Sequence, residues 1–404
     1  MHRYRALLAL PGARAPMLLS IAGSMPIGMF GLGILLLVRD STGSFAEAGR
    51  VLGVFSLANA CGAVAQGRLM DRLGQGPVLR TVASLHFPAL IALVVAAHEH
   101  APAAVLFLFA LCGGGTLPQL PAAMRSLWTT LAEDDTQRET AYAVVTIAFE
   151  VAVVTAPAIV AGIVAVASPA AAVIAAATLG AGSAIAFTLT GASRAWRGTR
   201  HEVGWLGPLV APGMRTVFVV LLAFGTAVGI VQVAVPAFAL DRGSDSIGGV
   251  LLAALSLGSL LGGLVYGSRS WAGTLPSRLA GVLAGIGVAF SLLALPTAYL
   301  PLGLLLVLGG LMFAPTVVIC STLLDTVAPP GTVTEAFAVT IMAIVAGTAV
   351  GNALGGTLVE SSYDAAVLAA AGVAVGGSIV VLARRGTISV EATEIRLDRG
   401  HLRR

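Results

Sequence analysis

The sequence predicts an all-α membrane protein with about twelve transmembrane helices in two six-helix halves. Three observations predict this fold class. Hydrophobic residues make up 57% of the chain and charged residues only 10%, whereas a soluble domain carries about 25% charged residues. Apolar runs of roughly 20 residues, the length that crosses a bilayer, follow one another along the chain. The basic residues gather in alternate loops between these runs. With so little charge available to cover a surface, the bilayer is expected to be the solvent.

The positions of the apolar runs predict the individual helices. In the first half they fall at 16–38, 46–69, 78–98, 101–123, 140–165 and 169–190. In the second half they fall at 216–240, 247–267, 278–298, 301–324, 335–358 and 364–383. The chain is therefore divided into an N-terminal half (1–190), a cytoplasmic linker (191–215), a C-terminal half (216–383) and a cytoplasmic tail (384–404). The first run is long and lacks a small-residue cleavage site, so it is expected to remain as a span rather than be removed as a signal peptide.

The arginine distribution predicts the orientation of the chain. All 23 basic residues are arginine, and 20 of them lie in segments predicted to be cytoplasmic. The other three are predicted to lie on the outer side: Arg39, Arg50 and Arg242. Because arginine-rich loops stay on the cytoplasmic side of a membrane, both termini are expected to be cytoplasmic in a multi-pass protein of the cell membrane. This topology also accounts for the net charge of +4 without a nucleic-acid partner.

The two halves of the chain resemble each other. Residues 140–144 (TAYAV) match residues 335–339 (EAFAV) at an offset of 195, and Gly62 matches Gly258 at an offset of 196. Six helices, a polar linker and six related helices are typical of secondary transporters built from parallel repeats. The sequence contains no Gly-Lys-Ser/Thr loop that would cradle a nucleotide phosphate, so an ATP-driven pump and a nucleotide cofactor are not predicted.

A motif follows the second predicted helix. The segment from Gly67 to Gly74 reads GRLMDRLG. It resembles the signature of the major facilitator superfamily, G-x-L-a-D-r-x-G, and lies where that family places it. In the family this loop latches the two halves while the inner gate is closed. The resemblance therefore implies a gating role for Gly67, Asp71, Arg72 and Gly74. Gln75 and Gly76 depart from the family, which usually has basic residues there. An ordinary charged loop is the alternative.

The fifth predicted helix carries a second motif. Residues 150–162 read EVAVVTAPAIVAG, which resembles the fifth-helix antiporter signature of the same superfamily, with Ala156 in place of its glycine. A proline inside a helix removes one backbone hydrogen bond and bends the helix. Small residues beside the bend allow tight packing against a neighbour. The resemblance implies a gating role for Ala156 and Pro157, and it favours efflux, closest in pattern to the proton-coupled multidrug-type members. A generic small-residue helix contact is the alternative.

Glu150 is an acidic residue predicted to lie deep in the membrane. Ten residues separate it from the cytoplasmic end of its helix near Thr140, which at about 1.5 Å each is a depth of ~15 Å. That depth is near the middle of a core about 30 Å thick. A charged carboxyl there costs about 2.5–3.5 kcal/mol, so it should face the protein interior. We therefore expect Glu150 to carry the coupled proton. A structural carboxyl, hydrogen-bonded to a neighbouring helix, is the alternative.

The first, fourth and seventh predicted helices line the central cavity by analogy with the family. Methionine and phenylalanine would offer it a soft apolar surface that accepts varied ligands. The candidate substrate-binding residues are Met25, Met29, Phe30, Thr116, Gln119 and Gln232. Of the remaining polar residues, Asn59 and Asn352 are expected to bridge helices, and His86 is expected to be structural. Cys61, Cys112 and Cys320 have no metal-site spacing and are expected to be small core residues.

The resemblance implies a transporter of the major facilitator superfamily and its twelve-helix fold. The expected function is export of an apolar or amphipathic small molecule in exchange for protons, by alternating access. One alternative is uptake or exchange of a small metabolite by the same fold. The other is a sensor or scaffold that does not transport. The expected partners are a small-molecule substrate, protons and the lipid bilayer, for a monomeric chain without cofactor, metal, nucleic acid or enzymatic activity.

Overall fold

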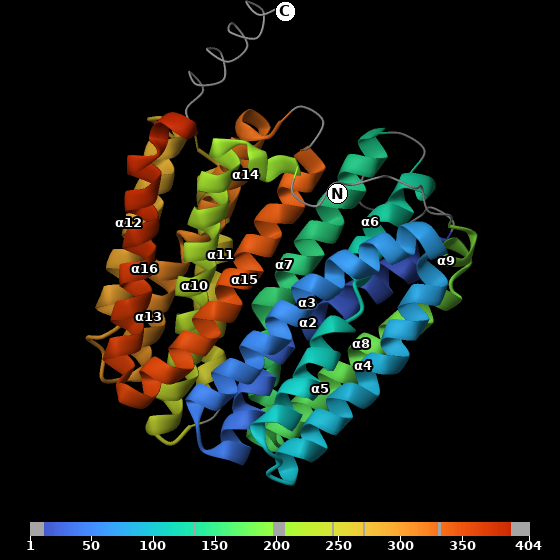
Figure 1. Ribbon diagram of the computed structural model, residues 1–404, viewed down its shortest axis with the longest axis horizontal. Coiled ribbons are helices and arrows are strands. Elements are labelled where there is room, and N and C mark those ends of the chain that lie inside the picture. Colours follow the sequence, from blue (N-terminus) through green and yellow to red (C-terminus); the bar gives the residue numbers. More distant parts are fainter. Residues whose placement is uncertain are drawn as a thin grey trace, which may run out of the picture. The chain divides into compact units, whose positions relative to one another are not determined.

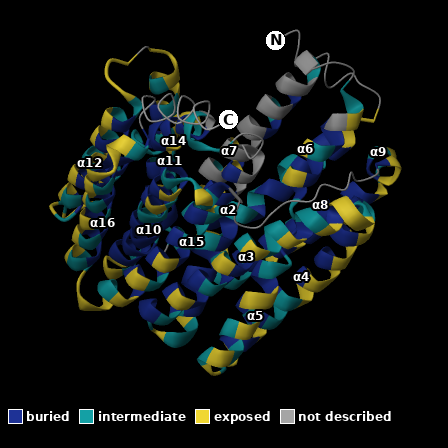
Figure 2. Cartoon of the chain, turned by 45° about the horizontal axis from the view of Figure 1, so that its top comes forward, coloured by how far each residue is buried: buried dark blue, intermediate teal, exposed yellow. Residues whose placement is uncertain are grey.

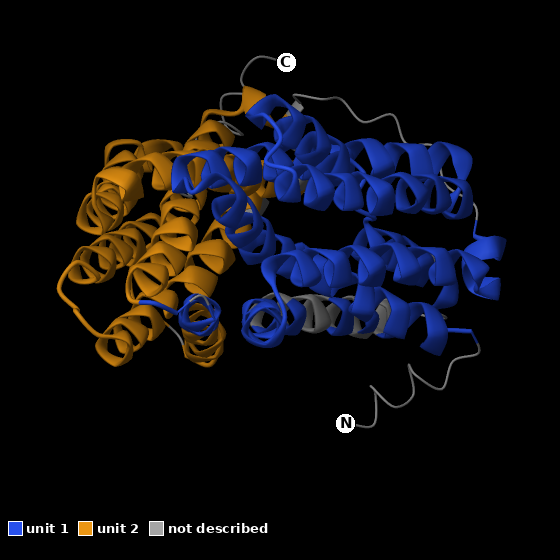
Figure 3. Ribbon diagram, turned by 90° about the horizontal axis from the view of Figure 1, so that it is seen from below, with its two compact units in different colours: residues 1–202, 243–253 blue, residues 203–242, 254–404 orange. Residues whose placement is uncertain are grey.

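The computed structural model describes residues 12–132, 135–196, 207–244, 246–269, 271–329 and 333–388. These residues form long α-helices joined by short turns (Figure 1). Their contacts divide the chain into two compact units (Figure 3). Unit 1 consists of residues 1–202 with 243–253, and unit 2 consists of residues 203–242 with 254–404.

The helices follow one another in chain order within each unit. Unit 1 contains α2 (Arg14–Thr42), α3 (Phe45–Leu73), α4 (Gln75–His98), α5 (Ala103–Gly115), α6 (Leu120–Leu131), α7 (Asp135–Val166), α8 (Pro169–Leu189) and the short α9 (Gly191–Ala195). Unit 2 contains η1 (Gly207–Val210), α10 (Pro212–Asp241), α12 (Leu275–Leu292), α13 (Tyr299–Gly310), α14 (Phe313–Val327), α15 (Val333–Ser361), α16 (Tyr363–Ala383) and η2 (Arg385–Thr387). Helix α11 (Ile247–Gly267) begins in the segment grouped with unit 1 and continues in unit 2.

Most of the predicted spans are present as apolar helices. Among the described residues, eleven helical segments are long and apolar enough to cross a membrane. The fifth predicted span lies in α7, whose described residues include a shorter apolar stretch, Thr155–Val166. The all-α, multi-pass character of the chain is therefore confirmed, and the count of twelve spans stays a prediction.

The two units repeat one packing scheme. In unit 1, α2 packs against α7 and α8, and α4 packs against α5 and α8. In unit 2, α10 packs against α15 and α16, and α12 packs against α13 and α16. These pairs correspond to one another under the offset found in the sequence. The structural repeat therefore agrees with the sequence repeat and makes position-by-position comparison of the units meaningful.

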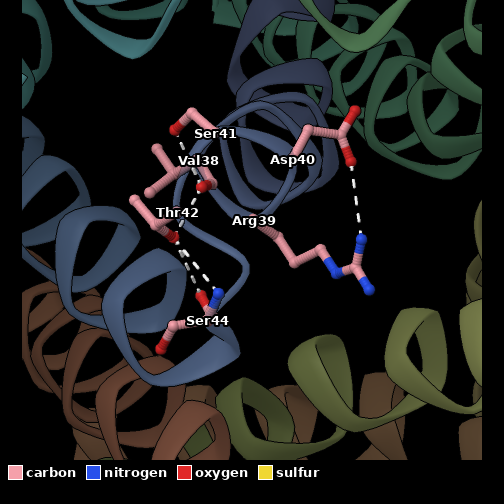
Figure 4. Close-up of polar contacts among 6 residues, drawn as sticks. All are labelled: Val38, Arg39, Asp40, Ser41, Thr42 and Ser44. Atoms are coloured by element: carbon pink, nitrogen blue, oxygen red, sulfur yellow. Dashed lines mark hydrogen bonds and ion pairs between the residues drawn. The ribbon is translucent and has the colours of Figure 1, made fainter. Parts of the chain in front are cut away.

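The turn between α2 and α3 shows how local sequence ends one helix and begins the next (Figure 4). The Thr42 hydroxyl donates to the Val38 carbonyl oxygen at 2.8 Å and accepts from the Ser44 amide at 3.2 Å. Gly43 then turns the chain with a φ of 74°, a conformation that suits glycine. The Ser44 hydroxyl caps α3 by accepting from the Glu47 amide at 3.1 Å. Side-chain oxygens thus satisfy backbone groups at both helix ends.

The fourth and tenth predicted helices are each broken, which corrects the expectation of a single helix. The first becomes α5 and α6, and the second becomes α13 and α14. Proline has no amide hydrogen for the carbonyl four residues earlier. Pro121 therefore cannot bond to the Leu117 carbonyl, and Pro315 cannot bond to the Leu311 carbonyl. We call these interruptions the α5–α6 break and the α13–α14 break.

Exposed residues are spread along the helices (Figure 2), and many of them have large apolar side chains, as expected of surfaces that meet lipid. Leu85 of α4 and Leu108 of α5, for example, are 54% and 53% exposed. The cysteines need a correction for the same reason. Cys320 is buried, as predicted, but Cys61 and Cys112 are exposed. In a bilayer a small apolar side chain is as stable on the lipid-facing surface as in the core. An apolar sequence context therefore does not predict whether a cysteine is buried.

Candidate functional site

The α5–α6 break exposes backbone carbonyls inside unit 1, and glutamines bond to them. Gln66 of α3 is 2% exposed. Its Nε2 donates to the Leu117 carbonyl oxygen at 2.9 Å and to the Gly115 carbonyl oxygen at 3.2 Å. Its Oε1 accepts from the Gln119 amide at 3.2 Å. Gln66 thus replaces helical hydrogen bonds that the break removes, and it fixes the backbone at Gln119.

Gln119, which lies at the break itself, adds a second side-chain link between the break and α3. Its Nε2 donates to Asn59 Oδ1 at 2.9 Å and to the Leu117 carbonyl oxygen at 3.0 Å. Asn59 and Gln119 are both half-buried, unlike Gln66. We call Asn59, Gln66 and Gln119 the amide cluster. Its buried member holds the backbone, and its two half-buried members keep polar groups accessible.

The other candidate substrate residues of unit 1 lie in different environments. Met25 is half-buried, whereas Met29 and Phe30 are buried at 3% and 0% exposure. The Phe30 ring packs against the Phe55 ring, with centroids 5.2 Å apart, and against the His86 ring at 5.4 Å. The structure therefore places Phe30 in the core of unit 1. Thr116 is half-buried at the break, and its hydroxyl donates to the Cys112 carbonyl oxygen at 2.6 Å.

His86 is part of the same core. It is fully buried, and its Nδ1 lies 2.9 Å from the Gly113 carbonyl oxygen. Since a carbonyl oxygen only accepts, Nδ1 carries the proton and His86 donates to α5. Its Nε2 has no hydrogen-bond partner among the described residues. These contacts agree with the structural role expected for His86.

The candidate residues of unit 2 lie on α10 and α15. Gln232 is half-buried on α10. Asn352 of α15 is 1% exposed, and its backbone is close to Gly229 of α10. The Asn352 Oδ1 has no hydrogen-bond partner in the described part of the chain. The α10–α15 contact therefore depends on close backbone packing.

The motif between α3 and α4 forms a tight turn. Helix α3 ends at Leu73, Gly74 adopts a φ of 87°, and α4 begins at Gln75. The Gly74 amide donates to the Met70 carbonyl oxygen at 2.8 Å. Glycine is required because side chains rarely tolerate a positive φ. Asp71 and Arg72 are exposed beside the turn, and Gly67 is half-buried with open space beside its Cα.

Gln75 has a structural role that the sequence did not reveal. It is fully buried, and its Nε2 donates to the Ala123 carbonyl oxygen and to the Ser126 hydroxyl, both at 2.9 Å. Trp196 bonds to the same helix, since its Nε1 donates to the Ser126 carbonyl oxygen at 3.0 Å. The departure from the family pattern at Gln75 therefore ties the start of α4 to α6. The sequence signal for this role is the position of Gln75 within the motif.

The antiporter-like segment of α7 packs closely against other parts of unit 1. Ala156 is fully buried and Pro157 is half-buried. A Cβ atom added at Gly249 would lie 2.5 Å from the Pro157 carbonyl oxygen and 2.7 Å from the Ala161 Cβ. The backbone of α7 includes Glu150, whereas the Glu150 side chain lies outside the described residues.

Comparisons with known proteins agree with this architecture. Residues 17–301 match the family model described as Major Facilitator Superfamily. No curated protein matches the chain. The fold is similar to the crystal structure of the nucleoside transporter NupG, with a TM-score of 0.73 and 16% identity over 93% of this chain and 99% of that chain. It is also similar to the peptide transporter POT in complex with sulfate, with a TM-score of 0.70 and 16% identity over 94% of this chain and 95% of that chain.

The described residues hold no cluster of histidine, cysteine and acidic side chains that could bind a metal ion. What they do hold is a repeated set of membrane-spanning helices, a tight motif turn, a small-residue contact on α7 and an amide cluster at a helix break. The family match over residues 17–301, on a chain whose described helices are long and apolar enough to cross a membrane, shows that the chain is a multi-pass membrane transporter that belongs to the major facilitator superfamily.

Proposed function

We propose that the chain exports an apolar or amphipathic small molecule in exchange for protons, by alternating access. The observation that carries this proposal is the close contact between Gly249 and the Pro157–Ala161 segment of α7. Backbone packed against small residues leaves no room for water between them. An exchanger needs such a dry contact, because a leak of protons past the carrier would dissipate the gradient that drives export.

Glu150 is the proposed proton carrier. Helix α7 runs unbroken from Asp135 to Val166, so Glu150 and Pro157 lie seven residues apart on nearly the same face. A change in the bend at Pro157 would alter the packing and the water access of that face. In this proposal the carboxyl binds a proton from the outer side and releases it to the inner side. Substrate binding and proton binding alternate as the inner and outer gates open in turn.

The substrate class follows from the surroundings of the α5–α6 break. Asn59 and Gln119 present amide groups, which donate and accept hydrogen bonds. Met25 adds a flexible apolar side chain within unit 1, and all three residues are half-buried. A few polar groups among apolar side chains are typical of sites for drug-sized ligands. An amphipathic molecule suits this combination better than a strongly charged one.

Uptake or exchange of a polar metabolite is the second candidate function. The hydrogen bond between Gln119 and Asn59 favours it, because paired amides suit a substrate rich in hydrogen-bonding groups. The two similar solved structures are those of a nucleoside transporter and a peptide transporter. At 16% identity these likenesses concern the fold, and the substrates belong to those proteins.

Flux in proteoliposomes tests the proposal. A panel of amphipathic cations, nucleosides and dipeptides is first screened by thermal shift on purified protein, and each stabilising compound is then supplied outside the vesicles. Exchange for protons predicts accumulation when the lumen is more acidic than the outside, since protons leave as substrate enters. Accumulation only with a more alkaline lumen would show that protons and substrate move together, which contradicts export. Protein-free vesicles under the same gradient are the control.

Orientation is part of the same proposal. We infer that both termini are cytoplasmic, from the division of arginines between alternate loops. Reporter fusions at Ser244 and after Arg404 test this inference in cells. A cytoplasmic signal from the C-terminal fusion and an external signal at Ser244 are expected, and an external C-terminus would contradict an even number of spans.

A further inference from the structure

Unit 2 contains an apolar pocket beside the α13–α14 break. Its volume is about 400 Å³, which is in the range of pockets that hold small ligands. The end of α11 lines it with Tyr266, the segment before α12 with Trp271, α12 with Gly281, and the break with Met312 and Pro315. None of the residues assigned above to the substrate, the proton or the gates lines this pocket. The arginine distribution predicts that this end of α11 and α12 is cytoplasmic.

The pocket is open because two of the positions that line it carry no side chain. Gly262 corresponds to Gln66 at the sequence offset of 196. In unit 1 the Gln66 side chain reaches the equivalent break and bonds to its carbonyl oxygens. Gly281 adds to the space, since no atom apart from the backbone of its own helix lies within 4 Å of the place where a Cβ would be. Unit 2 therefore leaves room where unit 1 places a polar side chain.

One wall of the pocket is a pair of aromatic rings held in place by hydrogen bonds. The Tyr266 and Trp271 rings are stacked, with centroids 5.3 Å apart and planes 14° apart. The Trp271 Nε1 donates to the Tyr266 carbonyl oxygen at 3.0 Å. Arg278 of α12 fixes the same segment, since its Nε donates to the Ala272 carbonyl oxygen at 3.2 Å and its Nη2 donates to the Trp271 carbonyl oxygen. The flat wall is thus formed before a ligand binds, which reduces the freedom lost on binding.

The α13–α14 break contributes an adaptable part of the wall. Met312 lies between the two helices, and its thioether packs against α12 at Gly285, where an added Cβ would overlap it. A methionine side chain adjusts to the shape of a ligand, and its sulfur makes favourable contacts with aromatic rings. Leu311 and Pro315 line the pocket beside it. A fixed flat wall and an adaptable thioether together suit a ligand that contains an aromatic ring.

The charges around the pocket narrow the class of ligand. Among the described residues, Arg278 is the only charged one that lines it, and two of its N–H donors are occupied by backbone carbonyls. A cationic ligand would lie near this guanidinium with no carboxylate in the lining to balance it. A strongly charged anion would exchange water for a mostly apolar wall, which is costly. A neutral ligand avoids both penalties.

We propose that this pocket binds a flat, uncharged aromatic molecule, at a second site separate from that of the substrate. A ring can stack on the aromatic wall, and such ring pairs contribute more than their buried area alone. The acyl chain of a lipid is the other apolar candidate, but it would lose bond rotations in the pocket without gaining a stacking contact. Because Leu311 and Pro315 lie on the two sides of the α13–α14 break, a bound ring would also stabilise the break.

Three matched compounds test the class of ligand on the purified full-length chain in lipid nanodiscs, with the thermal midpoint as the readout. Naphthalene-2-carboxamide has a flat ring and no charge. Its analogue 2-naphthylmethylamine has the same ring with a positive charge, and decanamide has the same amide on a flexible chain. Naphthalene-2-carboxamide should raise the midpoint in a saturable way, with an affinity about tenfold higher than that of either analogue. Equal affinity for decanamide or for the amine, or no shift with naphthalene-2-carboxamide, would contradict the proposal.

Substitutions locate the binding. Gly281→Leu places a side chain in the open space of the pocket and should weaken binding of naphthalene-2-carboxamide about tenfold or more. Gly372→Leu is the matched control, since Gly372 of α16 also has open space beside it and does not line the pocket. Trp271→Leu removes one ring of the wall and should weaken binding several-fold, whereas Trp271→Phe should keep most of it. Thermal midpoints without ligand show whether each variant is folded.

A variant of the amide cluster distinguishes this site from the proposed substrate site. Gln119→Leu should leave the affinity for naphthalene-2-carboxamide at the wild-type value. Loss of binding in Gln119→Leu, together with wild-type binding in Gly281→Leu and Trp271→Leu, would place the compound at the amide cluster and overturn the proposal. Because the pocket and the amide cluster share no residue, either proposal can fail while the other stands.

Discussion

The α5–α6 break of unit 1 and the α13–α14 break of unit 2 occupy equivalent positions in the repeat, yet their neighbours differ. Gln66 corresponds to Gly262 at the sequence offset of 196, and Gly115 corresponds to Leu311. In unit 1 the Gln66 side chain bonds to the Gly115 carbonyl oxygen at 3.2 Å. In unit 2 the backbone of Gly262 itself lies against the Leu311 carbonyl oxygen. A side-chain hydrogen bond in one unit is thus replaced by direct backbone contact in the other.

Under the proposed function, this difference divides a duplicated framework into a binding half and a packing half. Both units keep a glycine packed against a backbone carbonyl, although the two carbonyls are not equivalent: a Cβ added at Gly62 would overlap the Gly115 carbonyl oxygen, and one added at Gly258 would overlap the Val307 carbonyl oxygen. Unit 1 adds to this contact a set of amides, two of which stay accessible. At the positions equivalent to Asn59 and Gln119, unit 2 has Leu255 and Pro315. We therefore expect the polar part of the substrate site in unit 1.

Breaking the shared contact should have the largest effect. Gly62→Val and Gly258→Val each force side-chain atoms into a backbone carbonyl. Overpacking of this kind costs about 1–3 kcal/mol, and we expect the upper end of that range because the obstacle is backbone. Both thermal midpoints in detergent should fall by a similar amount. Gly31→Val and Gly281→Val, at positions with open space beside the glycine, are the controls and should melt close to the wild type.

Removing the buried amide should be the next largest change, and it distinguishes the units. Gln66→Leu leaves the Gly115 carbonyl without its side-chain donor and leaves the Leu117 carbonyl with Gln119 alone. An unsatisfied buried polar group costs about 1–3 kcal/mol. The thermal midpoint should fall, and ligand stabilisation should fall with it, because Gln119 loses its backbone anchor. A midpoint equal to that of the wild type would mean that the amide cluster does not hold the break.

Substituting the accessible amide should affect ligand binding more than stability. Gln119→Leu keeps the size of the side chain but removes its donor and acceptor. Binding of a compound found by thermal shift should weaken about tenfold, or ~1.4 kcal/mol. Gln232→Leu, on α10 of unit 2, is the comparison. A larger loss from Gln232→Leu than from Gln119→Leu would assign the polar part of the site to unit 2 and reverse the proposed division.

The motif turn should give the smallest change in stability. Asp71 is exposed, so Asp71→Asn should alter the free energy of unfolding by no more than ~0.5 kcal/mol. The effect of Asp71→Asn should appear in gating. Cysteines of the protein should react more readily with a thiol reagent added on the cytoplasmic side, and transport should fall. Asp241→Asn, an exposed carboxylate outside the motif, is the control. Wild-type accessibility and transport in Asp71→Asn would remove the gating role proposed for this residue.

Much of the fold could be predicted from the sequence, because a bilayer imposes a simple rule on helix length and composition. The predicted span 247–267 coincides with α11, and most other ends differ by a few residues. The two broken helices could not be predicted from apolar content alone. A proline inside a span either bends a helix or ends it, and the outcome depends on neighbours such as Gln66 that bond to the freed carbonyls.

The candidate site was predicted less completely, for the same physical reason. The sequence predicts Gln119 from its position but not its partner Gln66, because one glutamine in an apolar run gives no sign of what it faces. The sequence predicts that Phe30 lines the cavity, whereas in the structure it packs in the core against Phe55. Apolar side chains suit a cavity wall and a core equally well, so only tertiary contacts distinguish the two.

Gradient-driven flux through variants at Glu150 tests the proposed function most directly. Wild type, Glu150→Gln and Glu150→Ala are reconstituted in proteoliposomes, and uptake with an acidic lumen is compared with passive exchange of substrate. Because the glutamine amide has the shape of the acid but carries no exchangeable carboxyl proton, Glu150→Gln should lose gradient-driven uptake and keep exchange. Glu150→Ala should lose gradient-driven uptake as well. Full gradient-driven uptake by Glu150→Gln would contradict proton transport through this residue.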